Sequence, residues 1–262
     1  RGVSKIIVGL GGSATVDGGT GILGALGIRF LDAAGKDLGG LPASLVDLAR
    51  IDDTGLDPRI RQVELTMLCD VDNKLLGGQG SAAVFGPQKG ASADDVNKLE
   101  AALAKFSAIA MQEKGSNMSE LVSGGAAGGA AAGLHLFLGA RLAGGIDHFL
   151  HLTHFNEALQ HSDLVITGEG SIDEQTLQGK GPFGVAVSAK AHGLPVIGLA
   201  GRLPLENNTS LSKYFDVLLA IGNEPSGLVA ALQSTASNLK RTAQEIGNLL
   251  AIIYSRPPSQ PA

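Results

Sequence analysis

The chain contains very few cysteines and aromatic residues. Its 262 residues include one cysteine, Cys69, no tryptophan, and 4% aromatic residues in all. A single cysteine excludes an intrachain disulfide framework and is typical of a reducing compartment, so we expect a cytoplasmic protein. With few aromatics, the core must be built from Ala, Val, Ile and Leu. Such side chains allow helices to pack closely on a sheet, as in a layered α/β protein.

The chain also lacks long apolar runs and blocks of basic residues. No apolar stretch is long and glycine-free enough to cross a membrane, and no signal peptide is visible. The formal net charge is −5, and no basic stripe with interleaved aromatics occurs. Neither a membrane nor a nucleic acid is therefore an expected partner. Glycine, in contrast, is abundant at 38 residues, but it has no fixed period, which excludes collagen and a flexible linker.

The beginning of the chain is unusual for a complete domain. It opens with Arg1 rather than Met and enters a predicted strand almost at once. A domain that began there would have little to cover its first strand. We therefore expect a fragment of a longer protein.

The first part of the chain mixes predicted strands with predicted helices. Strands are expected over residues 4–10, 27–31 and 63–70. Ser92, with Asp95 three residues later, resembles a capping box that opens a helix whose apolar residues recur at helical spacing. A second helix, rich in Gly and Ala, is expected from about residue 126 to 142.

The pattern changes after about Thr153. Three apolar runs, DLVITGEG, LPVIGLAG and FDVLLAIG, each end in glycine and are separated by helix candidates. Such an alternation indicates parallel strands buried on both faces. A helix over residues 228–250 follows, and the tail SRPPSQPA is expected to be disordered. We place a domain boundary between residues 154 and 155, with a Rossmann-like half sheet after it, which is not a complete domain.

The segment GLGGSATVDGGTG follows the first predicted strand and matches the spacing G-x-G-x-x-A of a dinucleotide-binding turn. Asp32 ends the next apolar run at about the distance that this motif requires. In a dinucleotide turn, however, a helix must begin directly after the motif. Gly18, Gly19 and Gly21 would weaken such a helix by up to about 1 kcal/mol each. A nicotinamide-dependent oxidoreductase is therefore the weaker interpretation of this segment.

The better interpretation of the same segment is an extended anion-binding loop. Gly11 and Gly12 contribute exposed N–H groups, Ser13 and Thr15 contribute hydroxyls, and Asp17 places a carboxylate beside them. The alternative is a plain glycine-rich turn that Asp17 merely caps.

A second block, TGEGSIDEQTLQGKGPFGVA, begins in a predicted parallel strand and runs past its carboxyl end, where open α/β sheets bind ligands. Its candidate site residues are the acids Glu169 and Asp173, the lysine Lys180, and the glycines Gly168 and Gly170. Acids, a lysine and exposed N–H groups suit a phosphorylated ligand or Mg²⁺. The spacing does not fit a Walker A loop. The alternative is a solvated loop with ion pairs.

A third block, CDVDNKLLGGQGSAAVFGPQKGA, begins at another predicted strand end. Leu75 stands where an EF-hand loop needs glycine, so calcium sensing is rejected. Asp70 remains a candidate for orienting a hydroxyl or a metal-bound water, and Lys89 a candidate for binding an anion. The alternative is a polar strand end and an exposed lysine. His148 and its neighbouring histidines have no acid or cysteine to complete a metal set.

Several blocks together resemble one family. GLGGSATVDGG, LCDVDNKLLG, VFGPQKGA, GAAGG, TGEGSIDEQTLQGKGPFGVA and GLAG resemble, in that order and over nearly the whole chain, the bacterial type I glycerate kinases. The resemblance implies phosphorylation of D-glycerate by ATP, with Mg²⁺, to give 2-phosphoglycerate. It also implies two α/β domains. Residues 1–154 would be a central domain inserted into a discontinuous Rossmann-like domain, of which residues 155–262 are the C-terminal part. A homodimer is compatible with it.

The resemblance also suggests roles for the candidate residues. Lys180 and the loop from Gly11 to Ser13 would hold the glycerate carboxylate or the phosphates. Asp70 or Glu169 would help to bind Mg²⁺. Asp173 or Asp17 would accept the hydroxyl proton, and we prefer Asp173 because it follows a parallel strand end in the most specific block.

Two positions depart from the family pattern. Val16 stands where the family usually has Asn, and Lys74 stands where it usually has Pro. Val16 would remove a side-chain hydrogen bond to the substrate or to the loop, which bears on substrate affinity more than on the fold. The competing classes are a glycerate- or nucleotide-binding protein without catalysis and, less favoured, the oxidoreductase.

Overall fold

The structure is a computed structural model that describes all residues except 1, 178, 207–209 and 255–262. The chain divides into two compact units, residues 1–149 and 150–262. The domain boundary predicted after residue 154 lies a few residues C-terminal to this division. That the first part is inserted into a discontinuous domain stays a prediction. The tail SRPPSQPA, expected to be disordered, lies outside the described residues.

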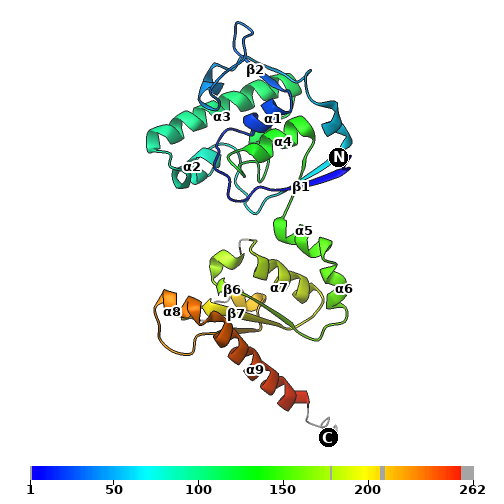
Figure 1. The fold of residues 1–262 in the computed structure, drawn as a ribbon, viewed down its shortest axis with the longest axis vertical. Coiled ribbons are helices and arrows are strands. Elements are labelled where there is room, and N and C mark those ends of the chain that lie inside the picture. Colours follow the sequence, from blue (N-terminus) through cyan, green and yellow to red (C-terminus); the bar gives the residue numbers. More distant parts are fainter. Residues whose placement is uncertain (1, 178, 207–209, 255–262) are drawn as a thin grey trace. The chain divides into compact units, whose positions relative to one another are not determined.

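The first unit contains a parallel three-stranded sheet (Figure 1). Strand β4 (Glu64–Leu68) lies in the middle and pairs in parallel with β1 (Lys5–Gly9) and with β5 (Arg141–Ala143). The strands predicted over residues 4–10 and 63–70 are thus confirmed. Because the three strands run the same way, the segments that follow them all leave from one edge of the sheet.

Helices and a separate strand pair complete the first unit. They are α1 (Thr20–Ala25), α2 (Ser81–Phe85), α3 (Ala93–Lys114), α4 (Ala130–Leu138), β2 (Arg29–Leu31) and its antiparallel partner β3 (Arg50–Asp52). The predicted capping box at the start of α3 is present: Ser92 Oγ accepts the Asp95 N–H, and the Asp95 carboxylate accepts the Ser92 N–H. Phe106 of α3 is fully buried and stacks on Phe137.

The prediction of one helix over residues 126–142 is wrong at both ends, because α4 spans only Ala130–Leu138. Gly128 and Gly129 precede it with φ of 71° and 88°, a left-handed conformation that does not continue a helix. A Cβ at Gly128 would lie 1.9 Å from the Thr15 carbonyl oxygen, so this glycine is needed for close contact with the glycine-rich loop. Gly139 ends α4 at φ 67°, and the residues after it join the sheet as β5.

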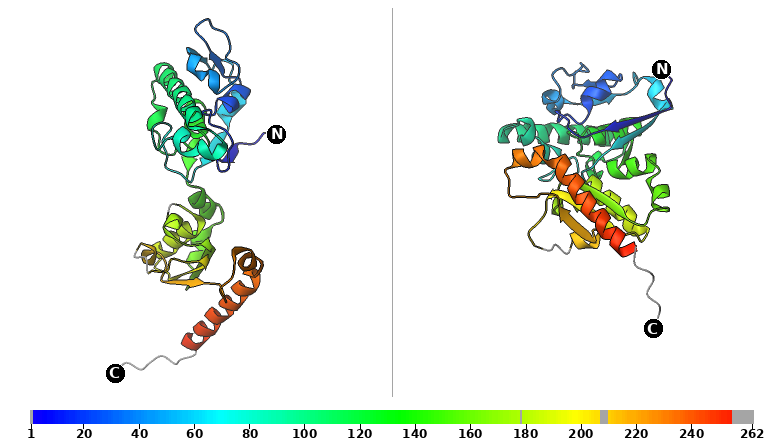
Figure 2. Two further views of the ribbon diagram at one scale, coloured as in Figure 1. Left: turned by 90° about the vertical axis from the view of Figure 1, so that its left-hand side faces the viewer. Right: turned by 60° about the horizontal axis from the view of Figure 1, so that its bottom comes forward.

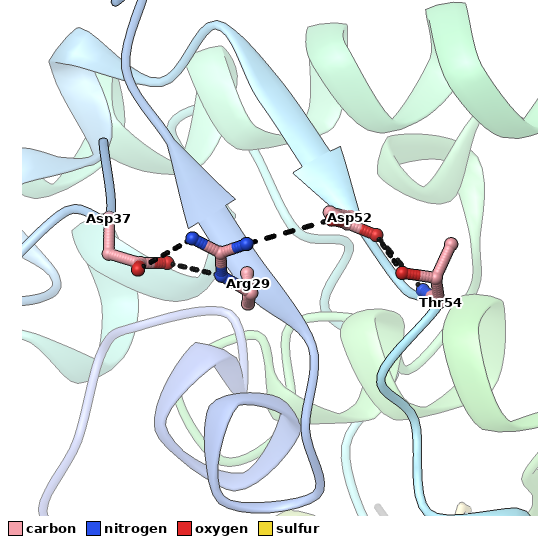
Figure 3. Close-up of polar contacts among 4 residues, drawn as sticks. All are labelled: Arg29, Asp37, Asp52 and Thr54. Atoms are coloured by element: carbon pink, nitrogen blue, oxygen red, sulfur yellow. Dashed lines mark hydrogen bonds and ion pairs between the residues drawn. The ribbon is translucent and has the colours of Figure 1, made fainter. Parts of the chain in front are cut away.

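The β2–β3 pair carries charged residues at its surface (Figure 3). The Arg29 guanidinium donates to both carboxylate oxygens of Asp37, at 2.9 and 2.8 Å, and lies 3.9 Å from the Asp52 carboxylate. The Thr54 hydroxyl donates to Asp52 at 2.6 Å. The bond from Arg29 lowers the pKa of Asp37, and the bond from Thr54 lowers the pKa of Asp52. Asp52 therefore links β3 to β2 through Arg29, and Asp37 links the segment between the two strands to β2.

The second unit contains the three strands predicted from the apolar runs. They are β6 (Val165–Ser171), β7 (Val196–Arg202) and β8 (Val217–Ala220), all parallel and in the order β6-β7-β8. The mixed α/β class with parallel sheets is confirmed. The helices of this unit are α6 (Phe155–Leu159), α7 (Gly181–Ala191), α8 (Leu228–Gln233) and α9 (Thr235–Tyr254); α5 (Gly145–Leu152) crosses the division between the units.

Helices α7 and α9 lie on opposite sides of this sheet (Figure 1, Figure 2). Ala186 and Ala189 of α7 pack with Val196 of β7, whereas Ile246 of α9 packs with the alternate β7 residue Leu199. The alternation follows from the two-residue period of a strand. No helix in the described part of the chain is long and apolar enough to span a bilayer.

The prediction of one continuous helix over residues 228–250 is also wrong, because α8 ends at Gln233 and α9 begins at Thr235. The Thr235 hydroxyl donates to the Ala231 carbonyl, and the Ser237 hydroxyl donates to the Ser234 carbonyl. Short hydroxyl side chains compete with the helix for backbone groups in this way, which explains the interruption.

Candidate active site

The glycine-rich loop follows β1 and does not lead directly into a helix. Residues 10–19 are non-helical, and α1 begins only at Thr20. The helix that a dinucleotide-binding turn requires after its motif is therefore missing at that place. Asp32, the acid that the dinucleotide interpretation needed, accepts the N–H groups of Ala34 and Lys36 in its own turn.

Asp17 holds the end of this loop in shape. Its carboxylate accepts the N–H of Gly19 at 3.0 Å and the N–H of Gly21 at 3.1 Å, while its carbonyl accepts the Thr20 hydroxyl at 2.8 Å. Both carboxylate oxygens are thus used at the start of α1. These contacts favour the capping alternative for Asp17, and its proposed catalytic role stays a prediction.

Lys89 connects the third sequence block to this loop. It ends a short 3-10 helix (Pro87–Lys89), and its Nζ donates to Ser13 Oγ at 3.0 Å and to the Thr15 carbonyl at 2.6 Å. Partial burial lowers the pKa of Lys89, although nearby Asp17 acts in the opposite direction. The lysine therefore places a positive charge against the middle of the glycine-rich loop.

A cavity of about 170 Å³ lies at the carboxyl ends of β1 and β4. Its lining includes five predicted site residues from two separate blocks, namely Gly11, Gly12, Ser13, Asp70 and Lys89. The structure thus brings these residues together. The cavity combines backbone N–H groups, a hydroxyl, a carboxylate and an ammonium group, which suits a small anion that also carries hydroxyls.

Asp70 lies at the cavity just after β4. Its Oδ1 accepts the Gly145 N–H at 2.8 Å, and a Cβ at Gly145 would lie 2.7 Å from the same oxygen. Gly145 is the first residue of α5. The glycine therefore allows Asp70 to reach the start of α5 and still line the cavity.

Cys69 also lines this cavity, in surroundings that disfavour a reactive thiolate. The residue is 8% exposed, and burial, with a smaller effect of Asp70, raises the pKa of its thiol to about 11. The thiol is therefore protonated at neutral pH, and the unprotonated form is the reactive one. The sequence-based interpretation of Cys69 as a small buried residue agrees with this position.

The two departures from the family pattern have structural explanations. Val16 is 6% exposed and belongs to the hydrophobic core of the first unit, and it is not among the residues that line the cavity. Its side chain contributes to packing in this chain, and the expected effect on substrate affinity stays a prediction. Lys74 forms an ion pair with Glu120 at 2.6 Å.

The acidic block of the second unit forms its own cluster at the end of β6. The buried Thr176 hydroxyl donates to Glu169 Oε1 at 2.6 Å and accepts the Asp173 N–H at 3.1 Å. Lys180 Nζ lies 4.0 Å from Glu169 Oε2, and Asp173 Oδ1 accepts the Gln175 N–H at 2.9 Å. Glu169, Asp173 and Lys180 are thus brought together. Sequence reasoning missed Thr176. Its position in the same polar block, between Asp173 and Lys180, could have indicated it.

A second, larger cavity of about 560 Å³ lies in the second unit, and Gly168, Glu169 and Gly170 contribute to its lining. Within the described residues, no group of three or more His, Cys, Asp or Glu side chains could hold a metal ion. The interpretation that the histidines around His148 hold no metal stays a prediction. Asp70 and Glu169 belong to different units, and their proposed part in binding Mg²⁺ stays a prediction.

Comparison with known proteins gives a consistent result. The model of the Glycerate kinase family matches residues 1–251. Glycerate kinase from Bacillus subtilis is 44% identical over 94% of this chain and 64% of its own length. Glycerate 2-kinase from Escherichia coli is 39% identical over 96% of this chain and 66% of its own length. The chain thus spans about two thirds of the length of these curated relatives.

A solved structure has the same fold. The crystal structure of a glycerate kinase 2 from Salmonella typhimurium LT2 matches with a TM-score of 0.81 at 40% sequence identity. The match covers 97% of this chain and 66% of that one.

Proposed function

The chain belongs to the glycerate kinase family, and from this membership we propose that its protein transfers the γ-phosphoryl group of ATP to D-glycerate. The expected product is 2-phosphoglycerate. The observation that carries the proposal is the cavity of the first unit, where a lysine, a carboxylate and a loop of N–H groups converge in about 170 Å³. A three-carbon acid with two hydroxyls needs this combination and little space.

In this proposal, the first cavity binds glycerate. The Lys89 ammonium group and the N–H groups of Gly11 and Gly12 hold the carboxylate, and the Ser13 hydroxyl donates to it. Asp70 accepts a hydrogen bond from a glycerate hydroxyl and so fixes which way the molecule lies. Thr15 contributes indirectly, because its carbonyl holds Lys89 in place.

The acidic cluster of the second unit then serves the phosphoryl transfer. The glycerate hydroxyl oxygen forms a bond to the γ-phosphorus, the bond from that phosphorus to the β-phosphate oxygen breaks, and ADP leaves. Asp173 accepts the hydroxyl proton, as a positioned carboxylate can. Lys180, with N–H groups at Gly168 and Gly170, neutralises phosphate charge. Thr176 holds the carboxylate of Glu169 in one orientation.

The residues present fit a Mg²⁺ that is bound mainly through the phosphates of ATP. Mg²⁺ commonly takes one or two protein carboxylates and completes its octahedron with phosphate oxygens and water. Glu169 and Asp70 each offer one carboxylate with an oxygen beyond the hydrogen bond described above. When bound, Mg²⁺ would neutralise the charge that develops on the phosphates.

The test is an assay of the purified protein with D-glycerate, ATP and Mg²⁺, in which ADP release is coupled to a spectroscopic signal and the product is identified by ³¹P NMR. We expect 2-phosphoglycerate in amounts equal to ADP. Asp173→Asn should lower turnover by about 10²–10⁴-fold, the usual contribution of a general base. The exposed Asp163→Asn is the matched control and should leave turnover unchanged.

Two outcomes would contradict this proposal. Binding of glycerate without ADP release would support the alternative of a binding protein without catalysis. A mild effect of Asp173→Asn would remove the assignment of the base while leaving the reaction in place. A cytoplasmic location, inferred from the single Cys69, and a homodimer stay predictions that fractionation and sedimentation can test.

A further inference from the structure

Most of the larger cavity of the second unit has no role in the proposed phosphoryl transfer, which uses only Gly168, Glu169 and Gly170 of its lining. Its lining comes from residues 166–170 of β6, the carboxyl-terminal half of β7, the turn after β8, and the helices α8 and α9. Its walls are mainly aliphatic and include Ile166, Leu199, Ile221, Leu232 and Leu239. At about 560 Å³ it is more than three times as large as the cavity of the first unit, and it falls in the size range of small-molecule sites.

The position of this cavity in the fold is that of a ligand site. Open parallel sheets bind ligands in the crevice at the carboxyl ends of their strands. The lining contains Gly168 and Gly170 of β6, Gly201 of β7, and Gly222 just after β8. The edge of the sheet at the cavity therefore presents bare backbone from the end of each strand.

Two of these glycines are not required by the fold. A Cβ at Gly170 or at Gly222 would meet no atom within 4 Å, and neither residue has a positive φ. Packing and backbone conformation would thus tolerate alanine at both positions. Close approach of a ligand to the backbone is a physical reason for glycine where the fold supplies none.

One polar residue of the lining is buried. Asn238 of α9 is 7% exposed and stands among aliphatic neighbours. Its amide can donate and accept hydrogen bonds at the same time, which matches the N6 amino group and the adjacent ring nitrogen of adenine. An apolar cavity with one such amide suits a flat heteroaromatic base better than a purely aliphatic ligand.

We propose that this cavity binds the adenine base and ribose of ATP. The base lies against Leu199 and Ile221 and pairs with the amide of Asn238. The phosphates then pass over the bare backbone at Gly170 toward Lys180. This assignment rests on the proposed function, because it takes ATP as the phosphoryl donor.

The test measures nucleotide binding directly, by titration calorimetry of the purified protein with ADP, adenosine and tripolyphosphate. Ala231→Phe fills the cavity, and Asn238→Leu removes the amide without changing its size much. We expect each variant to weaken ADP and adenosine binding at least tenfold and to leave tripolyphosphate binding unchanged. Gly222→Ala should weaken ADP binding in the same direction.

The control is Gly247→Ala on α9, where a Cβ also meets open space but which does not line the cavity. It should bind ADP like the wild type. Thermal unfolding of every variant checks that a loss of binding is not a loss of fold. Because Gly222→Ala adds one methyl group in open space, it keeps the test valid even where Ala231→Phe fails to fold.

The outcomes separate this assignment from the proposed function. Wild-type ADP affinity in all cavity variants, with glycerate still phosphorylated, would overturn the adenine site and leave the kinase proposal intact. Selective loss of ADP binding in the variants, with no phosphorylation of glycerate by the wild type, would support the nucleotide site and remove glycerate as the acceptor. A wild-type protein that binds neither ADP nor adenosine would overturn this inference.

Discussion

Replacing Lys89 with methionine gives the sharpest test of the cavity in the first unit. The side chain keeps most of its length and loses its charge. In the wild type, Lys89 Nζ donates to Ser13 Oγ and to the Thr15 carbonyl, so the lysine could act on the substrate, on the loop, or on both. The two roles predict different measurements. A substrate contact changes the affinity for glycerate, whereas a loop contact changes the stability of the fold.

The size of each effect follows from the geometry. A hydrogen bond from an ammonium group to a carboxylate contributes about 1.5–3 kcal/mol, which corresponds to about 10–150-fold in affinity. Lys89 is only half-buried, so we expect the lower part of this range. Water can replace the ammonium group at Ser13 and Thr15 for the same reason. The free energy of unfolding should therefore fall by no more than about 1 kcal/mol.

The assay is steady-state kinetics with glycerate and ATP varied separately. For Lys89→Met we expect the KM for glycerate to rise at least tenfold while the KM for ATP stays within twofold. In the wild type, the KM for glycerate should also rise with pH as Lys89 loses its proton, and because burial lowers the pKa of Lys89, this should begin below the usual lysine range near 10.5. The Lys89→Met variant should lack that dependence on pH.

Lys36→Met is the control, because Lys36 is exposed in a turn of the same unit. An unchanged KM for glycerate in Lys89→Met, together with a large drop in melting temperature, would refute the assigned role. Lys89 would then serve only to hold the loop.

Three further predictions concern the first unit. Cys69, whose thiol has a pKa of about 11, should resist iodoacetamide at pH 7.5 in the folded protein and react on addition of denaturant, and rapid labelling of the native state would contradict its burial. Gly128→Ala should lower the free energy of unfolding by about 2–4 kcal/mol in urea titrations, because φ is +71° and the new Cβ would lie 1.9 Å from the Thr15 carbonyl oxygen. Val16→Asn should cost about 1–3 kcal/mol, because it buries an amide in the core, and a lower KM for glycerate without destabilisation would restore the substrate contact that the family pattern suggested.

The strands that sequence reasoning found are those in which apolar residues follow one another. The runs at residues 63–70 and around Val165, Val196 and Val217 form strands of parallel sheets. Burial on both faces, which the continuous apolar pattern predicted, is wrong for β6 and β8, because Ile166 is 48% and Val217 42% exposed. The strand β5 has only three residues, which is too short for any period, so local sequence could not reveal it. Its pairing with β4 decides its conformation.

The predicted helix boundaries were wrong where contacts with distant residues, or hydrogen bonds from side-chain hydroxyls, outweigh the local preference for helix. The alanines before α4 favour a helix, yet contact between Gly128 and Thr15 forces a left-handed turn there. The break between α8 and α9 depends on the hydroxyl of Thr235, which bonds to a carbonyl one turn earlier. A polar residue in an amphipathic pattern looks like a surface position, so neither the break nor the burial of Asn238 was apparent.

Sequence analysis predicted the parts of the candidate site separately, because each part has a recognisable local pattern of residues. A run of glycines with hydroxyls, an acid after a strand and a lysine between glycines can each be recognised alone. That Lys89 reaches Ser13, 76 positions away, depends on the fold and has no local signal. The same contact places a positive charge at the loop. The Asp17 carboxylate accepts the N–H groups of Gly19 and Gly21, and the ammonium group of Lys89 lies against the same loop at the cavity.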